Sequence, residues 1–422
     1  MADRDAPLDC VIAGGGPAGV VAGLLLARAG LRVTVLEKHL DFLRDFRGDT
    51  VHASTLALIE RLGLGPAFRR LPHRDADRLV MELDEGAFTL ADFTHLPGEF
   101  RHISLVPQWD LLDLLATEAA RWPGFTLRQG WEVTGLLFGE APGPGGAGRV
   151  EGVVARDADG VTHEVRARLT IGADGRGSRV REAAGLPVRS FGAPIDVLWF
   201  RLPLAAGDPE DVTIRVSAGA MAVLIRRETH WQCGLLVPKG HAQQLLRDDG
   251  APLGERLGRL EPWLAERARA LRAADAHLLD VRLDRLQRWS RPGLLCIGDA
   301  AHAMSPVAGV GINLAVQDAV ATVNRVAAPL RAGRDARDVD RLLPGVQRRR
   351  RLPTVVTQAL QRQAHARLLA PVTSAEAGTA APVSGALRVV GRTPWLQRRL
   401  GRLVAIGLRP EVPSSPMVSP VR

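Results

Sequence analysis

Residues 9–39 read DCVIAGGGPAGVVAGLLLARAGLRVTVLEKH, and this stretch decides the fold. The apolar run Val11–Ala13 is typical of a buried strand, and the apolar run 32–37 predicts a second one. Between them, residues 17–28 contain no helix breaker except two glycines and predict a helix. A strand, a glycine-rich turn, a helix and a second strand form one βαβ unit, so the chain is predicted to begin with a parallel α/β sheet.

The turn of this unit carries three glycines with the G-x-G-x-x-G spacing. Gly14 allows the tight turn, Gly16 lets a pyrophosphate approach bare backbone, and Gly19 lets the helix pack closely on the strand. The helix N-terminus faces the phosphates, and an acid that ends the second strand hydrogen-bonds a ribose hydroxyl. A plain glycine-rich turn is the alternative, but it explains neither the second strand nor the acid. The sequence therefore predicts a dinucleotide site that contains Gly14, Gly16, Pro17, Ala18, Gly19, Glu37 and Lys38.

The composition argues against a nucleic-acid partner, although the chain of 422 residues has a formal net charge of +9. Lysine occurs only as Lys38 and Lys239, so nearly all of the 55 basic residues are arginines, and these are spread along the whole chain. That pattern indicates a general preference for arginine over lysine and not a binding face. The one dense cluster, Arg348–Arg351, is interpreted as a solvated helix face, while an anionic substrate or a membrane surface stays open as a partner.

Cysteine use and hydropathy indicate a cytoplasmic protein. Cys10, Cys233 and Cys296 lie far apart in apolar runs and are expected to be buried thiols in a reducing compartment. We expect no signal peptide, because the N-terminus has no cationic start that leads into an apolar stretch. No apolar run reaches the length of a membrane span, and no close His/Cys cluster has metal-ligand spacing, so neither a transmembrane segment nor a metal site is expected.

Two later segments repeat the pattern of strand, turn and helix. In the first, apolar residues from Leu169 lead into a turn at Asp174, and a helix is predicted directly after it. In the second, the buried strand 294–297 ends in a turn at Gly298 and Asp299, and the Asp299 carboxylate is suited to accept hydrogen bonds from sugar hydroxyls. A long helix, 312–326, follows. The backbone at its start suits the partial negative charge of a cofactor carbonyl and comprises Gly309, Gly311, Ile312 and Asn313.

Residues 187–276 change character and are predicted to form a second domain. Their apolar runs predict an antiparallel sheet and then a single helix over 253–271. A hairpin earlier in the chain, within residues 79–93, is also predicted. After residue 340 the sequence predicts helices over 344–352, 355–369 and 395–408, while 142–148 is expected to be a hairpin tip.

The three motifs, in this order, resemble the single-component FAD-dependent aromatic hydroxylases, the p-hydroxybenzoate hydroxylase-like flavoprotein monooxygenases. The resemblance covers about residues 8–330 and implies FAD held by the first and third motifs. It implies that the second motif, around Asp174, serves both FAD and transient NAD(P)H binding. Arg47 occupies a cofactor-contacting position of the family, Gln108 a position beside the pyrophosphate, and Val133 one whose backbone meets the adenine.

The resemblance also implies which residues lie near the flavin ring. His302 and Pro306 belong to the third motif and are expected close to the isoalloxazine, although helix-entry packing is an equal alternative for His302. His52, in the polar loop before the helix 53–62, is a second candidate, and a plain helix-entry role is again the alternative. For Arg47, the alternative to a phosphate contact is a surface ion pair.

The predicted fold is α/β: a Rossmann-type FAD domain with an inserted antiparallel sheet and a helical C-terminal tail. The predicted FAD-binding domain comprises 1–78, 101–186 and 277–340. The substrate-binding sheet domain comprises 79–100 and 187–276, and the helical region 341–422.

The expected reaction is NAD(P)H- and O2-dependent hydroxylation of an electron-rich ring through a flavin C4a-hydroperoxide, so the cofactor carries the chemistry. The chain contains no tyrosine, which excludes a tyrosine relay for deprotonating the substrate and favours a polycyclic or quinone-like aromatic over a simple phenol. A reductase or dehydrogenase of the same fold is the alternative, and a non-enzymatic FAD- or ligand-binding protein is a third class. The protein is expected to be a monomer or a homodimer.

The inserted sheet is the expected source of the substrate-pocket walls. Alternation along the strand 197–202 places Trp199 and Arg201 on one face, and an arginine beside an aromatic ring suits an anionic or phenolic substrate. Trp231, on another strand, is the third predicted wall residue. The alternative is that both tryptophans belong to the core.

Overall fold

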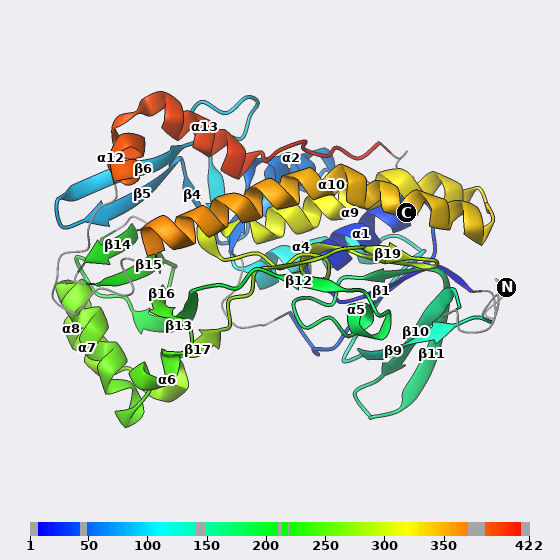
Figure 1. Ribbon diagram of the computed structural model, residues 1–422, viewed down its shortest axis with the longest axis horizontal. Helices are drawn as coiled ribbons and strands as arrows, with labels where there is room; N and C mark the ends of the chain where they lie inside the picture. Colours follow the sequence, from blue (N-terminus) through cyan, green and yellow to red (C-terminus); the bar gives the residue numbers. More distant parts are fainter. Residues whose placement is uncertain are drawn as a thin grey trace.

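The computed structural model describes residues 7–42, 49–140, 148–209, 213–217, 219–369 and 385–414. Two separate β-sheets lie at opposite ends of the long axis, and two long helices, α9 (Gly311–Arg331) and α10 (Ala336–Ala364), run side by side across the middle (Figure 1). This arrangement confirms the predicted α/β class with an antiparallel sheet and a helical C-terminal region.

The first sheet has eight strands and is parallel at its centre. β1 (Leu8–Ala13) lies between β2 (Val33–Glu37) and β11 (Thr162–Gly172), with β8 (Phe125–Gln129) beyond β2 and β20 (Leu294–Cys296) beyond β11. Parallel strands end at the same edge, so the turns after β1, β2, β11 and β20 converge there. The remaining strands pair antiparallel: β19 (Ser290–Arg291) with β20, β10 (Val150–Arg156) with β11, and β9 (Glu132–Phe138) with β10.

Helix α1 (Pro17–Arg28) follows β1 directly and is almost wholly buried. Gly16 is its N-cap and Pro17 its first residue, where the missing proline N–H costs no intrahelical hydrogen bond. α1 packs between α4 (Gln108–Ala120) and α9, which explains why its sequence is apolar on every face.

The second sheet has seven strands in the order β17-β13-β16-β15-β14-β5-β6. One face packs against α7 (Ala251–Leu260) and α8 (Ala265–Arg269) in a separate apolar cluster, and the other face looks toward the first sheet. The hairpin of β5 and β6 joins this sheet because β5 pairs with β14. The strand bounds are β5 (Arg78–Leu83), β6 (Gly86–Asp92), β13 (Ile195–Pro203), β14 (Thr213–Ser217), β15 (Ala220–Arg226), β16 (His230–Pro238) and β17 (His277–Leu279).

A small third sheet and the end of the chain connect these two bodies. The third sheet contains β3 (Thr50–Val51), β7 (Ile103–Leu105) and β4 (Arg74–Ala76). The C-terminal helices α12 (Gly385–Arg392) and α13 (Pro394–Ala405) pack on β6, at the upper left of Figure 1. Other short elements are α2 (Ala53–Arg61), α3 (Gly65–Phe68), α5 (Arg179–Ala183), α6 (Ala242–Leu245), β12 (Val188–Ser190) and β18 (Asp284–Leu286).

Two helix predictions are wrong. The single helix expected over 253–271 is broken near Pro262, where a short 3-10 segment separates α7 from α8. The two helices expected over 344–352 and 355–369 are instead one helix, α10, which continues through Pro344 and Pro353 and ends in a π-helical turn, His365–Leu369.

The interpretation of Arg348–Arg351 as a solvated face fails at Arg350, which is 1% exposed. The expected hairpin tip at 142–148 lies almost wholly outside the described residues. The predicted domain boundaries stay a prediction. Among the helices that the structure describes, none is long and apolar enough to cross a membrane.

Candidate functional site

One cavity of about 1610 Å³ extends from the carboxyl edge of the first sheet to the inner face of the second. Its first end is bounded by the turns after β1, β2 and β11 and by residues 304–312. Its second end is bounded by the seven-stranded sheet, with Leu369, Leu400 and Val404 from the C-terminal region. In α/β proteins, ligands bind outside the carboxyl ends of the parallel strands.

The glycines of the first motif have different surroundings. Gly14 has φ +102°, and a Cβ there would collide with the carbonyl oxygen of Ala173, at the end of β11. A Cβ on Gly19 would collide with the Gly14 carbonyl oxygen, so helix and strand meet at bare backbone. Gly16 lines the cavity, and a Cβ there would meet nothing within 4 Å. Gly16 therefore keeps space free for a ligand, whereas Gly14 and Gly19 allow the chain to pack on itself.

Glu37 fixes the turn from the end of β2. Its Oε2 accepts a hydrogen bond from the Gly15 N–H at 2.7 Å, and its Oε1 accepts one from the His39 N–H at 3.0 Å. The side chain is buried, yet Glu37, Lys38 and His39 all line the cavity. The acid thus holds the glycine turn in place as well as bordering the predicted ribose position.

The second motif is built around the partly buried carboxylate of Asp174. Asp174 accepts hydrogen bonds from the Ser178 hydroxyl at 2.5 Å and from the Val180 N–H at 3.0 Å, which caps the start of α5. Burial raises the pKa of Asp174, and these hydrogen bonds oppose the rise. A backbone that is anchored in this way presents Gly175 and Arg176 to the cavity.

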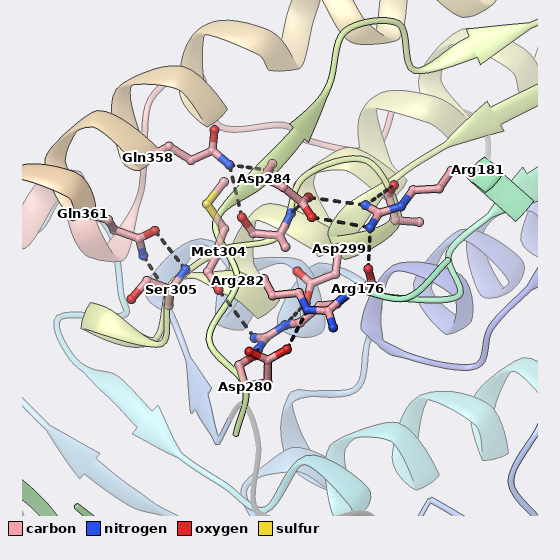
Figure 2. Close-up of polar contacts among 12 residues, drawn as sticks. Arg176, Arg181, Asp280, Arg282, Asp284, Asp299, Met304, Ser305, Gln358 and Gln361 are labelled. Carbon is pink, nitrogen blue, oxygen red and sulfur yellow. Dashed lines mark hydrogen bonds and ion pairs between the residues drawn. The ribbon is translucent and has the colours of Figure 1, made fainter. Parts of the chain in front are cut away.

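The second and third motifs meet through an ion pair. Arg176 Nε donates to Asp299 Oδ2 at 3.1 Å, and its guanidinium also approaches the carbonyl oxygens of Met304 and Asp280 (Figure 2). Both side chains are partly exposed and line the cavity. The Asp299 carboxylate, predicted to accept from sugar hydroxyls, is therefore already oriented by an arginine.

The loop before α9 forms the wall between the two ends of the cavity. Pro306, Gly309, Gly311 and Ile312 all line it. A Cβ on Gly309 would press on the Thr50 side chain, while a Cβ on Gly311 would meet nothing within 4 Å. The N-terminus of the long helix α9 thus faces the cavity with open space in front of it. The partial positive charge of a helix N-terminus suits an anionic or carbonyl group of a ligand.

Some of the other predicted cofactor residues line the cavity and some do not. The cavity is lined by Gln108, Val133, Pro17 and Ala18. Its lining residues do not include Gly19, Gly298 or Asn313. The Asn313 side-chain oxygen instead accepts hydrogen bonds from the hydroxyls of Ser54 and Thr55. Arg47 lies outside the described residues.

Neither candidate histidine lines the cavity. His302 is 1% exposed and turns its Nε2 to Asp318 Oδ2 at 2.5 Å, on α9. The buried Asp318 carboxylate holds the imidazole inside the protein, and the expected place of His302 beside the flavin ring stays a prediction. His52 is fully buried between the carbonyl oxygens of Val404 at 2.7 Å and Gly309 at 3.1 Å, so it is a link between the C-terminal helix and the third motif.

The inner face of the seven-stranded sheet supplies an apolar wall. Ile195, Val197 and Trp199 alternate along β13 and line the cavity. The Trp199 ring lies over Gly234, its cross-strand neighbour, where any Cβ would collide with it. Arg201 lies on the same side of β13 but is exposed and is not among the lining residues.

The prediction of Trp231 as a wall residue is wrong. It pairs with Leu202, on the face that packs against α7 and α8, and it is 1% exposed. Its indole N–H donates to Asp208 Oδ2 at 2.7 Å. The residue next to it, Gln232, is the one that lines the cavity.

Sequence reasoning missed a buried ion pair where the two sheets meet. Asp49, which lines the cavity, accepts from Arg227 at 2.6 Å and from the Gln232 side chain, both through Oδ2. Burial raises the pKa of Asp49, against the opposing charge of Arg227. Its Oδ1 has no hydrogen-bond partner among the described residues. The only sequence signal was its position in the polar loop that also contains Arg47.

It also missed a buried polar stripe along α10, whose members recur every three or four residues. Gln358 donates to the carbonyl oxygens of Asp284 and Ala303, and Gln361 holds Ser305 (Figure 2). This spacing on one helix face was a usable signal. The stripe comprises Arg350, Thr354, Gln358, Gln361 and His365.

Comparisons with known proteins agree with this geometry. A family model described as FAD binding domain matches residues 8–359. The 6-methylpretetramide 4-monooxygenase of Streptomyces rimosus is 36% identical over 356 residues, which cover 82% of this chain and 81% of that enzyme. The rifampicin monooxygenase of Streptomyces venezuelae is 27% identical, and the match covers 74% of this chain but only 62% of that enzyme.

Among solved structures, the anhydrotetracycline hydroxylase OxyS from Streptomyces rimosus superposes with a TM-score of 0.72 at 21% identity, covering 95% of this chain and 76% of that one. That likeness shows the fold. The family match and the 36% identical relative show more, and the motifs that line the cavity are those that the family model spans. The chain therefore belongs to the FAD-binding family of flavoprotein aromatic monooxygenases.

Proposed function

We propose that the protein hydroxylates a large, planar, polycyclic or quinone-like aromatic compound, using FAD, NAD(P)H and O2. The observation that carries this proposal is a continuous cavity that joins a glycine-lined cradle to an apolar sheet face. Its volume of about 1610 Å³ exceeds the roughly 300–1,000 Å³ of a typical small-molecule pocket. That volume suits a dinucleotide at one end and a bulky second ligand at the other.

The residues at the first end fit FAD. Gly16 and Gly311 both leave space where a Cβ would intrude, beside the N-termini of α1 and α9. Glu37 and Asp299 offer carboxylate oxygens for sugar and ribityl hydroxyls, and Gln108 and Val133 extend the same wall. Bound FAD supplies the redox and oxygen chemistry, and the protein supplies orientation and exclusion of water.

The residues at the second end favour a ring system with carbonyl groups. Its walls are mostly aliphatic, with Met81, Met221, Val223 and Leu236 among them. The indole N–H of Trp199 is buried and has no hydrogen-bond partner among the described residues. A buried donor in an apolar wall favours a ligand that brings an acceptor, such as a quinone oxygen. The relative of highest identity reported above is named for a 6-methylpretetramide substrate.

NAD(P)H would approach beside the second motif, where Arg176 and Arg179 line the cavity. The three cysteines are buried and unpaired, as suits a reducing cytoplasm. The proposed oligomeric state is a monomer or a homodimer.

The test is anaerobic reduction of the purified flavoprotein by NADH or NADPH with a panel of polycyclic quinones, followed by admission of O2. We expect a product that is heavier by one oxygen atom, with label from 18O2. Substrate reduction before O2 is admitted would identify a reductase instead, and neither reduction nor product would leave only a binding protein.

A further inference from the structure

We propose that helices α12 and α13 dock on the surface of an anionic lipid membrane. This inference goes beyond the proposed function and rests on it at one point, because a polycyclic substrate of the proposed class partitions into lipid. Both helices pack on β6 at the periphery of the molecule (Figure 1). We call their outward surface the α12/α13 face; it comprises the exposed residues Arg388, Val389, Arg392, Trp395, Arg398, Arg399 and Arg402.

One side of each helix is held against the protein, and the other side is exposed. On α13, Gln397, Gly401 and Ala405 recur every four residues and are buried. A Cβ on Gly401 would collide with the backbone of Asp92, so α13 meets the end of β6 at bare backbone. The Gln397 side chain donates to two carbonyl oxygens in the last turn of α12, each at 3.0 Å. The two helices therefore form one unit with a constant outward surface.

The α12/α13 face exposes two large apolar side chains. Trp395 is 59% exposed and Val389 is 58% exposed. The Arg399 guanidinium lies over the Trp395 ring, 5.5 Å from the ring centroid, so a cation flanks the exposed indole. Tryptophan is enriched where lipid hydrocarbon meets water, because its ring is apolar while its N–H still finds a polar partner. An exposed tryptophan among arginines is therefore typical of a helix that lies in the membrane interface.

The charge of this part of the chain has one sign. Residues 385–410 contain no acidic residue and six arginines, which are Arg388, Arg392, Arg398, Arg399, Arg402 and Arg409. Arg388 pairs with Glu85. The three arginines of α13 form no ion pair within the described part of the chain. Anionic lipid headgroups attract such clusters, and each arginine near the surface strengthens binding about fivefold.

The opposite side of α13 borders the substrate end of the cavity. Leu400 and Val404 line that end. At about 3.6 residues per turn, they lie roughly 140° and 180° around the helix from Trp395. The membrane side and the cavity side of α13 are thus separated by one helix diameter, about 10 Å. A substrate dissolved in the docked membrane therefore lies next to the wall of the cavity that is proposed to hold it.

Anionic lipid suits both parts of the α12/α13 face. Its headgroups pair with the arginines, and its acyl chains cover Trp395 and Val389. A soluble polyanion satisfies the arginines but leaves the apolar side chains in water. A second copy of the chain suits this surface less well, because two copies of the same positively charged surface repel each other.

The test uses the full-length, FAD-loaded protein and sedimentation with vesicles in about 0.15 M salt, which screens charges far from the contact. One set of vesicles contains phosphatidylglycerol and phosphatidylcholine in equal parts, and the other contains phosphatidylcholine alone. The α13 triple variant is Arg398→Gln, Arg399→Gln and Arg402→Gln. The control triple variant loses the same charge at exposed positions elsewhere, through Arg331→Gln, Arg337→Gln and Arg348→Gln.

We expect the wild-type protein and the control variant to bind the phosphatidylglycerol vesicles, and the α13 triple variant to bind them about a hundredfold more weakly. None of the three should bind phosphatidylcholine alone. A wild-type protein that binds neither set of vesicles would overturn the proposal. Equal losses in the two triple variants would also overturn it, because the total charge of the protein would then cause the binding. Neither result involves turnover, so the proposed function is tested separately.

The position of Trp395 is tested by fluorescence. Vesicles with brominated acyl chains quench a tryptophan that enters the hydrocarbon, so Trp395→Phe should remove most of the quenching. Trp263→Phe, at a partly exposed tryptophan beside α8, is the control and should leave the quenching unchanged. Equal quenching in the wild type and Trp395→Phe would overturn the docking of this face. A wild-type dimer that becomes a monomer on Trp395→Ser would assign the face to a second copy and overturn it likewise.

Discussion

The glycines of the first motif have different structural roles, although they belong to one sequence pattern. This pattern assigns Gly14 to the tight turn and Gly16 to the approach of the pyrophosphate. Both glycines line the cavity, but a side chain at position 14 would meet the end of β11, whereas one at position 16 would enter open space. We therefore expect position 16 to control cofactor affinity and position 14 to control folding.

We predict that Gly16→Val yields a folded protein that contains little FAD, because the valine projects into open space where the cofactor phosphates belong. Gly14→Val should instead give little folded protein, since its side chain meets the Ala173 carbonyl at a positive φ. Flavin absorbance per protein and thermal unfolding separate the two effects. A Gly16→Val protein with full yellow colour would refute the assignment.

Trp199 provides the sharpest test of the substrate wall. Trp199→Phe keeps most of the ring and removes the indole N–H, which has no partner within the described part of the chain. KM for a quinone-like substrate should therefore rise about fivefold, the equivalent of roughly 1 kcal/mol for one hydrogen bond. Trp199→Ala should also uncouple NAD(P)H oxidation from product formation. Arg201→Ala is the control, since Arg201 is exposed. Unchanged KM and coupling in both tryptophan variants would move the substrate away from β13.

At the scale of elements, a buried arginine of helix α10 connects this helix to α9 and to the Gly298–Asp299 turn. Arg350 Nε donates to Asp318 Oδ1 on α9 at 3.0 Å, and Asp318 Oδ2 accepts from the Gly298 N–H. Burial raises the pKa of Asp318, but His302 and Arg350 outweigh that rise and hold it below its ordinary value. The Gly298–Asp299 turn is thus supported from behind by a helix outside the three motifs.

Arg350→Leu should lower the free energy of unfolding by about 3–5 kcal/mol, because it leaves the buried Asp318 carboxylate without its arginine partner. Arg348→Leu, at an exposed position on the same helix, should change it by no more than about 0.5 kcal/mol. Urea unfolding followed by fluorescence measures both. Equal stability of the two variants would show that the Asp318 pair is not a structural requirement.

Sequence predicted the elements whose signals are local and failed where the answer depends on packing. The helix 17–28 is correct to the residue because its limits are set by Gly16 and the glycine-containing turn after Arg28. Trp199 and Trp231 were grouped together, but the pairing register of β13 and β16 puts them on opposite faces, and register is a tertiary property. His302, Asp49 and the α10 stripe depend on partners far away in the sequence.

At the scale of the whole molecule, three buried or partly buried histidines make the free energy of unfolding depend on pH. Burial lowers the pKa of His52, His230 and His365 from the ordinary 6.5. For His230, the nearby Arg201 and Arg227 contribute to the lowering. The unfolded chain therefore binds more protons than the folded one below pH 6.5.

The free energy of unfolding should consequently be level above about pH 6.5 and should fall as the pH drops below that value. A second loss should follow near pH 3.8, where carboxylates with lowered pKa, such as Asp280 and Asp318, begin to take up protons on unfolding. Urea midpoints at several pH values measure both. A midpoint that stays constant from pH 7.5 to pH 5 would contradict the neutral state of the histidines.

The roof of the cavity comes from the end of the chain, since Leu400 and Val404 of α13 line it and His52 holds the Val404 carbonyl oxygen. The cofactor cradle is encoded by quite different stretches of sequence. We therefore predict that a hybrid that carries the C-terminal helices of another family member keeps its flavin spectrum while accepting a different range of substrates.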